Sequence, residues 1–308
     1  MGTYVLKRFI ASLITIFIVV TVTFFLMRIM PGGPFNNDKL TPAIKANIEA
    51  KYGLDRPVFE QYTLYMTNLL KGDLGVSMVR QGRLVTDTIA YGFPTSAKLG
   101  TVTLVCSIFL GTLLGILSAL KQNKIEDKTI TVFSTLANTI PSFVIGSVLI
   151  YFLGVKWQLL PPTGFDSPQH YIMPVLALGG SSLAFITRLT RSELVEVKGS
   201  DYMRTAKAKG LSASTVIVKH GLKNSLIPVV TYLGPLVATL LTGTFVVEKI
   251  FAIPGLGREF VTSVTNRDYS MLLGVTAFYC AIIIMCNFVV DILYVLIDPR
   301  IKLENTEN

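Results

Sequence analysis

Six stretches without a charged side chain constrain the fold of this 308-residue chain more than any other feature. Each lacks Asp, Glu, Lys and Arg for 19 residues or more; they are residues 9–27, 99–120, 129–155, 167–187, 224–247 and 269–290. A helix of about 20 apolar residues crosses a bilayer, and in lipid the backbone must satisfy its own hydrogen bonds. The short alternating strands of a membrane barrel are absent from the sequence. We therefore expect an all-α membrane protein with six transmembrane helices.

The distribution of Lys and Arg predicts how these helices are oriented. More than half of the basic residues fall in four segments, 1–8, 121–128, 188–223 and 298–308, which places those segments and both termini in the cytoplasm. Residues 30–34 (MPGGP) offer no small-residue cleavage site, so the first span is expected to be retained rather than removed as a signal peptide. The predicted spans are residues 9–30, 99–120, 129–155, 171–187, 224–247 and 269–297, the last five within a core domain at 96–308. This layout also explains most of the +9 net charge without a nucleic-acid partner.

Residues 31–95 then lie outside the cell and are too long for a simple turn. Thr41 and Pro42 fit the start of a helix that Gly53 would close. A second helix is predicted from Pro57 to Gly72, with Val58, Tyr62, Tyr65, Met66 and Leu69 on one face. We expect a small helical cap that either braces the ends of the spans or receives an external partner.

The segment 188–223 is strongly basic and contains the string GSDYMRTAKAKGLS. Ser200 or Asp201 can begin a helix and Gly210 suits its left-handed end, which predicts a helix of about nine residues, too short to span a membrane. Ala206 and Ala208 would give it a small surface that another molecule can approach. The residue types alone leave two partners open, anionic lipid headgroups or a cytoplasmic protein.

Catalytic chemistry is not indicated. The sequence has no phosphate-binding G-x-x-x-x-G-K-[ST] loop, and Gly255-Leu256-Gly257 fits a turn. Cys106, Cys280 and Cys286 fall inside the apolar stretches, and His170 and His220 have no partner at ligand spacing, so we predict neither a metal site nor a catalytic residue. Asp291 is the one carboxylate within the predicted spans, and a packing or a pathway role is open for it. Gly111 and Gly115 form a GxxxG helix-packing motif.

Several strings in order along the chain resemble the membrane subunits of ABC importers, in particular the oligopeptide permease B subunits of the peptide and nickel branch. These strings are RIMPGGPF, YGLDRPVFEQY, GDLGVS, FPTSAKLG, ALKQN, TIPSFV, DYMRTAKAKGL, HGLKNSLIPVV, VVEKIFAIPGLGREF, NRDYSMLLG and DILYVLIDPRIK. In the general family pattern of the cytoplasmic loop, Arg204 and Thr205 stand where Glu and Ala are usual and Lys223 where Pro is usual, whereas Ala206 and Gly210 are retained. The peptide and nickel branch reads much like this chain at these positions.

The resemblance implies a type I ABC importer permease fold in the cytoplasmic membrane of a prokaryote, and a function that is not enzymatic. It implies a second permease, two ATPase subunits that bind ATP and Mg, and an extracytoplasmic binding protein that delivers oligopeptides; dipeptides or nickel are the alternative cargo. An ion-coupled transporter or channel is the distant alternative. The implied ATPase contact is a coupling helix formed by Asp201, Tyr202, Met203, Arg204, Thr205, Ala206, Lys207, Ala208, Lys209 and Gly210. Polar residues in the spans give candidate pathway positions at Asn138, Ser142, Thr239, Thr242, Tyr279 and Asn287.

Overall fold

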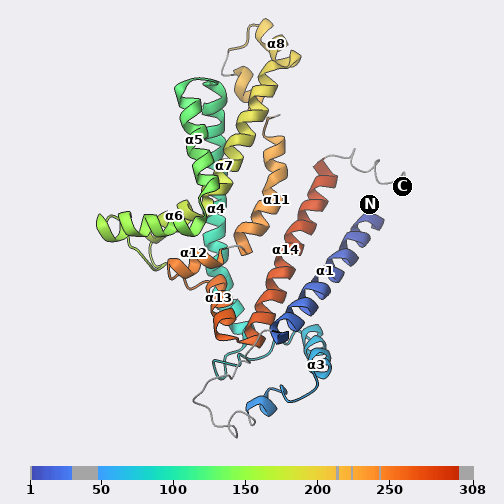
Figure 1. Cartoon of the computed structure of the whole chain (residues 1–308). Coiled ribbons are helices and arrows are strands. Elements are labelled where there is room, and N and C mark those ends of the chain that lie inside the picture. The colour runs from blue at the N-terminus through green and yellow to red at the C-terminus, as the bar shows by residue number, and fades with distance from the viewer. Residues whose placement is uncertain (1, 30–47, 213–214, 223–224, 243, 298–308) are drawn as a thin grey trace. The chain divides into compact units, whose positions relative to one another are not determined.

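The computed structural model describes residues 2–29, 48–212, 215–222, 225–242 and 244–297, and there every regular element is a helix (Figure 1). One isolated antiparallel bridge, Val76 with Leu84, is the exception in this part of the chain. Five helices are long and apolar enough to cross a membrane, or six if one bent pair counts as a single span. The predicted all-α membrane fold is confirmed. The helices of 13 residues or more are α1 (Gly2–Ile29), α3 (Val58–Leu70), α4 (Val85–Leu120), α5 (Ile125–Thr139), α7 (Gln169–Gly199), α11 (Ile227–Thr242) and α14 (Tyr269–Ile297).

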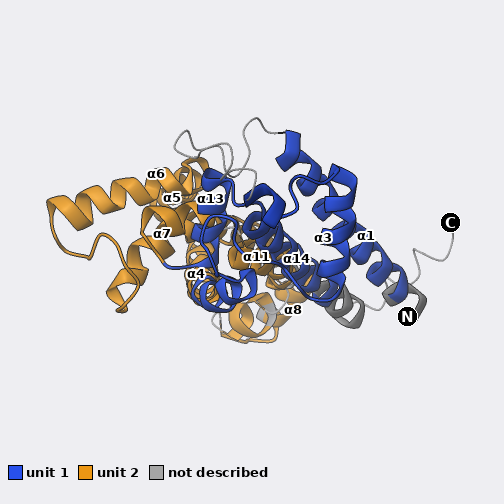
Figure 2. Ribbon diagram, turned by 90° about the horizontal axis from the view of Figure 1, so that it is seen from below, with its two compact units in different colours: residues 1–96, 254–308 blue, residues 97–253 orange. Residues whose placement is uncertain are grey.

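The shorter elements connect or extend these helices. They are α6 (Ser142–Leu149), the π-helix η1 (Ile150–Lys156), α8 (Asp201–Ala208), the π-helix η2 (Val216–Leu222), α12 (Phe245–Ile250) and α13 (Leu256–Asn266). The chain divides into two compact units, residues 1–96 with 254–308, and residues 97–253 (Figure 2). Helix α4 begins in the first unit and continues into the second.

In the first unit, α1 packs along α14 and α3 covers one end of the pair. Phe24 and Met27 of α1 meet Tyr269, Leu272 and Leu273 of α14 in one apolar cluster. Tyr62 and Tyr65 of α3 pack against this cluster, as the predicted face of the second cap helix requires. Pro57 is the N-cap of α3, and Gly72, in the left-handed region at φ +80°, follows the end of the helix. The start of the other cap helix, at Thr41 and Pro42, lies outside the described residues.

In the second unit, small residues let α4 approach α7 and α11 closely. A Cβ atom added to Gly111 would lie 3.0 Å from Ile186, and one added to Gly115 would lie 2.6 Å from Thr190. At Gly100 the added atom would lie 2.5 Å from the Leu240 carbonyl oxygen of α11. The GxxxG motif is therefore a helix-packing motif in this chain.

The third predicted span is wrong as a single helix over 129–155. Helix α5 and the segment Ser142–Lys156 meet at 104° instead. Ile140 is extended (φ −79°, ψ 126°) because it precedes Pro141, and the ring of a proline disfavours the helical conformation in the residue before it. Absence of charge predicts a long apolar segment, and the direction of the chain within it depends on this proline.

Three further spans differ from their predicted limits. Helix α4 begins at Val85 rather than at Leu99, so the end of the predicted cap is helical. Helix α7 continues to Gly199, so the first third of the predicted loop 188–223 extends the fourth span. The predicted fifth span is divided between α11 and α12. The predicted tail, 298–308, lies outside the described residues.

Candidate functional site: two surfaces beyond the predicted spans

The first surface is α8, the helix expected between Asp201 and Gly210. The carbonyl of Ser200 accepts the first helical hydrogen bond, from the Arg204 N–H at 3.2 Å, while the Ser200 hydroxyl donates back to Val197. Asp201 is thus the first helical residue, which suits a carboxylate near a helix N-terminus. Gly210 has φ +76°, the left-handed conformation predicted for the residue that ends this helix.

The two alanines of α8 have different environments. Ala206 is buried with Met203 and Val216, and Val197 of α7 packs against the three. The expectation that Ala206 offers a small surface to another molecule is therefore wrong: its side chain is used within the chain. Ala208 is exposed, as are six more residues of the predicted coupling helix. These six are Asp201, Tyr202, Arg204, Thr205, Lys209 and Gly210.

An ion pair between a half-buried arginine and a buried carboxylate supports the last turns of α7, the helix that precedes α8. Arg191 Nε donates to Asp127 Oδ1 at 2.6 Å and Arg191 Nη2 donates to Oδ2 at 2.8 Å, a two-pronged pairing. The Asp127 side chain is only 4% exposed. It also accepts bonds from the Ser118 hydroxyl and from the Asn123 N–H, so the turn between α4 and α5 is held to α7.

Lys198, near the end of α7, adds a second attachment by donating to the Ala119 carbonyl oxygen at 3.0 Å. Two polar contacts therefore bind the last turns of α7 to the end of α4 and the start of α5. No pattern in the sequence indicates this network. Asp127 and Arg191 are 64 residues apart, and no spacing rule connects them.

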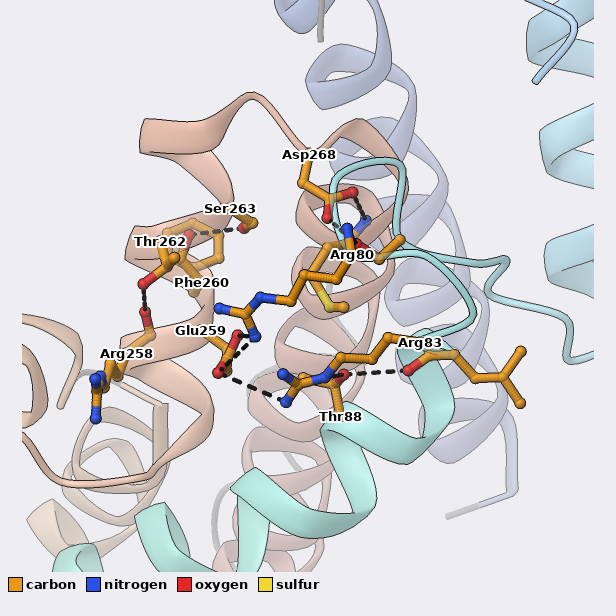
Figure 3. Close-up of polar contacts among 12 residues, drawn as sticks. Arg80, Arg83, Thr88, Arg258, Glu259, Phe260, Thr262, Ser263 and Asp268 are labelled. Carbon is orange, nitrogen blue, oxygen red and sulfur yellow. Dashed lines mark hydrogen bonds and ion pairs between the residues drawn. The ribbon is translucent and has the colours of Figure 1, made fainter. Parts of the chain in front are cut away.

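The second surface lies in the other unit and consists of residues 76–84 and α13 (Figure 3). Residues 76–84 form a small hairpin, closed by the Val76–Leu84 bridge and by the Ser77 N–H donating to the Arg83 carbonyl. Arg80 Nη1 donates to both carboxylate oxygens of Glu259 on α13, at 2.9 and 3.2 Å. Arg83 lies 3.6 Å from the same carboxylate and donates through Nε to the Thr88 hydroxyl.

Asp268 holds the other side of this hairpin. Its carboxylate accepts from the Ser77 hydroxyl, from the Met78 N–H at 3.0 Å and from the Met271 N–H at 3.3 Å, so it joins the hairpin to the start of α14. Ser77 is fully buried and Asp268 is 4% exposed. The start of α13 is fixed as well, because the Leu256 N–H donates to Ser96 of α4 at 2.9 Å. The predicted turn at Gly255–Gly257 is in fact the beginning of this helix.

The candidate pathway residues occupy different environments. Asn138 and Ser142 flank the bend after α5, whereas Thr239 and Thr242 donate their hydroxyls to carbonyls of their own helix, α11. Tyr279 is buried in α14 near Phe260 and Phe278, and Asn287 is exposed on the same helix. The hydroxyls of Thr239 and Thr242 have partners already, so their polarity alone does not indicate a pathway.

Among the described residues, no three His, Cys, Asp or Glu side chains lie close enough together to bind a metal ion. His170 Nδ1 faces the N–H and hydroxyl of Ser167 at the start of α7, a helix-end contact. The side chains of His220 and Asp291 lie outside the part of the chain that is described.

Comparison with known proteins decides the family. Residues 111–303 match the family described as binding-protein-dependent transport system inner membrane component, and residues 1–102 match its N-terminal family. The chain belongs to this family. It is therefore a multi-pass inner-membrane permease of an ABC importer, as the strings in its sequence predicted.

Named relatives cover almost the whole chain. The dipeptide transport system permease protein DppB of Bacillus subtilis (strain 168) is 45% identical over 98% of this chain and 99% of its own length. The oligopeptide transport system permease protein OppB of Haemophilus influenzae is 43% identical over 97% and 99%. A crystal structure of an amino acid ABC transporter has a TM-score of 0.50 at 18% identity, covering 68% of this chain and 93% of that one. The last comparison supports the type I importer fold.

Proposed function

We propose that this chain is one of two membrane subunits of an ATP-driven importer and forms half of the pathway for oligopeptides. The observation that carries the proposal is the match over nearly the full length to two peptide permeases. Dipeptides are the second candidate cargo, because the DppB relative is as similar as the OppB relative.

ATP hydrolysis belongs, in this proposal, to two separate ATPase subunits that bind ATP and Mg. The sequence has no phosphate-binding loop, so force must enter through a contact with those subunits. We assign the contact to the exposed residues of α8 and of the turn after it, where Arg204 and Lys209 can meet acidic side chains. A partner shifts a conformational equilibrium only by contacting its states differently, and α8 provides a surface at the end of the long helix α7.

A loaded extracytoplasmic binding protein would meet the opposite side of the membrane, at the hairpin 76–84 and α13. This assignment follows from the predicted orientation, with both termini and α8 in the cytoplasm. Arg80, Arg83 and Arg258 on this surface are suited to a partner with acidic side chains. The pathway would lie between the two permeases, with Asn138, Ser142, Thr239, Thr242, Tyr279 and Asn287 as candidate positions.

Purification of the native complex tests the assembly. We expect a second permease and two ATPase subunits to copurify, and we expect the complex in liposomes to import a labelled tripeptide only with ATP and the loaded binding protein. Import without ATP, driven by an ion gradient, would instead support the secondary transporter. Import of dipeptides but not of longer peptides would move the cargo to the second candidate.

Labelling of single cysteines tests the orientation. Lys71 and Lys209 are both exposed, and they fall on the predicted outer and inner sides. In a background without the three native cysteines, a cysteine at position 71 should react with an impermeant thiol reagent at the outer face of the cytoplasmic membrane, and one at 209 should not. The reverse pattern would invert the orientation, and the proposed partners would exchange sides.

A further inference from the structure

A cavity in the second unit is lined by charged side chains of both signs. It has a volume of about 380 Å³ and is lined by Lys98 and Val102 of α4 and by Phe165, Asp166 and Tyr171 around the start of α7. Cavities of this size are typical of sites for small molecules. None of the residues expected in the pathway or the coupling helix lines it.

Lys98 is an unusual residue for its position. It is the only charged side chain between Asp87 and Lys121, a stretch that α4 crosses as one helix. From Lys98 to Leu120 the helix rises roughly 33 Å, about the thickness of the hydrocarbon core, so Lys98 lies at one boundary of the membrane. By the proposed orientation this is the extracytoplasmic boundary, where cargo enters. At this boundary its exposed ammonium can reach water and charged groups that arrive from outside.

The ammonium of Lys98 has no carboxylate partner in the described part of the chain. Its Nζ lies 5.4 Å from the centre of the Tyr171 ring, which attracts a cation without neutralising it. Asp166, on the same cavity, likewise has no basic partner among the described residues. The two charges line one space and do not pair with each other.

Tyr171 adds an aromatic wall. Its ring lies 4.3 Å from that of Phe165, which lines the same cavity. The cavity therefore offers an ammonium to an anion, a carboxylate to a cation, and aromatic surface beside them.

A short peptide carries the matching groups, a terminal carboxylate and a terminal ammonium joined by an apolar and amide body. We infer that this cavity is a site for peptide termini, in which Lys98 receives the carboxylate and Asp166 the ammonium. The inference rests on the proposed function and adds to it a binding site on this chain. It predicts recognition of the charged ends common to all peptides, with little dependence on side chains.

Direct binding of tri-alanine to the complete complex, in nanodiscs and without the binding protein, tests the site. We compare three labelled probes: tri-alanine, its C-terminal amide and its N-acetyl form. Lys98→Met should weaken tri-alanine binding about tenfold and leave the affinity for the amide unchanged, because that probe has no carboxylate to lose. Asp166→Asn should weaken tri-alanine binding and leave the affinity for the N-acetyl probe unchanged.

Matched variants separate recognition from damage. Lys98→Arg should restore tri-alanine binding. Lys156→Met should have no effect, although Lys156 is also exposed in this unit with its ammonium 5.6 Å from an aromatic ring, that of Phe152. Equal losses for all three probes, or no loss with Lys98→Met, would overturn the site.

A lipid headgroup with both charges is the competing occupant. A photoreactive residue at Val102 should capture labelled tri-alanine, and excess unlabelled peptide should prevent capture. Capture of phospholipid that peptide does not displace would overturn the inference. The proposed function stands or falls separately, on ATP-dependent import of the tripeptide by the unaltered complex.

Discussion

The hairpin 76–84 and helix α8 are both short segments beyond the predicted spans, yet they are attached to their units by different forces. Charged and hydrogen-bonded groups hold the hairpin: Asp268 accepts three bonds and Glu259 pairs with two arginines. Apolar contact among Met203, Ala206 and Val216 holds α8. Hydrogen bonds restrict the orientation of the groups that they join, whereas apolar contact is not directional. We therefore expect the hairpin to keep one orientation and α8 to adjust against a partner.

The position of α8 also depends on α7, the helix that precedes it. The last turns of α7 are held by the Asp127–Arg191 pair. We predict the largest effect for Arg191→Ala, which leaves a buried carboxylate without its cation. Such a change typically costs about 3–5 kcal/mol. The thermal transition of the purified complex measures the loss, and transport should fall in parallel.

Two further variants provide the controls. Asp127→Ala together with Arg191→Ala removes both charges and should recover part of the lost stability. Lys156→Ala, in the same unit and without an ion pair among the described residues, should leave the transition unchanged. A negligible effect of Arg191→Ala would mean that the end of α7 does not depend on this pair.

The next largest effect is expected at the hairpin. Asp268→Ala removes the acceptor of the Ser77 hydroxyl and of two backbone N–H groups, and a buried donor left without a partner costs about 1–3 kcal/mol. Limited proteolysis should then cut within 76–84 while the rest of the complex stays intact. Asp73→Ala is the control, because this exposed carboxylate bonds, among the described residues, only to the Gly75 N–H of its own loop. Equal proteolysis of both variants would remove the distinction between the two attachments.

The two alanines of α8 sharpen the comparison further. Ala206→Trp should overfill the Met203–Val216 cluster, at a cost of about 1–3 kcal/mol, and so displace the helix. Ala208→Trp, on the exposed side, should leave stability unchanged and weaken copurification of the ATPase subunits. Normal transport by both variants would exclude α8 as the coupling contact and leave the lipid-facing role.

The sequence predicts the existence of these elements better than their contacts. Charge-free stretches predict spans because lipid does not tolerate unpaired charge, and Gly210 predicts the end of α8 because few other residues adopt its left-handed conformation. The sequence does not predict which side of α8 is buried. That side is set by contact with Val216, which belongs to the next element, η2. The prediction that Ala206 offers an open surface is wrong for this reason.

Long-range polar contacts were missed for a similar reason. Ser77 and Asp268 are separated by 191 residues, and Asp127 and Arg191 by 64, so each pair forms only when the helices are already packed. The bend after α5 is different, because Pro141 was visible in the sequence. Residues 129–155 are uniformly apolar, which predicts one continuous span. A proline disfavours the helical conformation in the residue before it, so Pro141 predicts a break at Ile140 within that stretch.

The smallest effect is expected at the arginines of the hairpin. Arg80 is 40% exposed on its side chain and its partner Glu259 is 22% exposed, so water and salt screen the pair. Arg80→Ala should change the stability of the complex by about 0–1 kcal/mol, and less at high salt. Glu259→Gln should cost slightly more, because it also removes the charge near Arg83, 3.6 Å away. Thermal transitions at low and high salt measure both changes. If Arg80→Ala were as destabilising as Asp268→Ala, the exposed ion pair would be the main attachment of the hairpin. High salt would then screen that attachment, and the hairpin would no longer be held more firmly than α8.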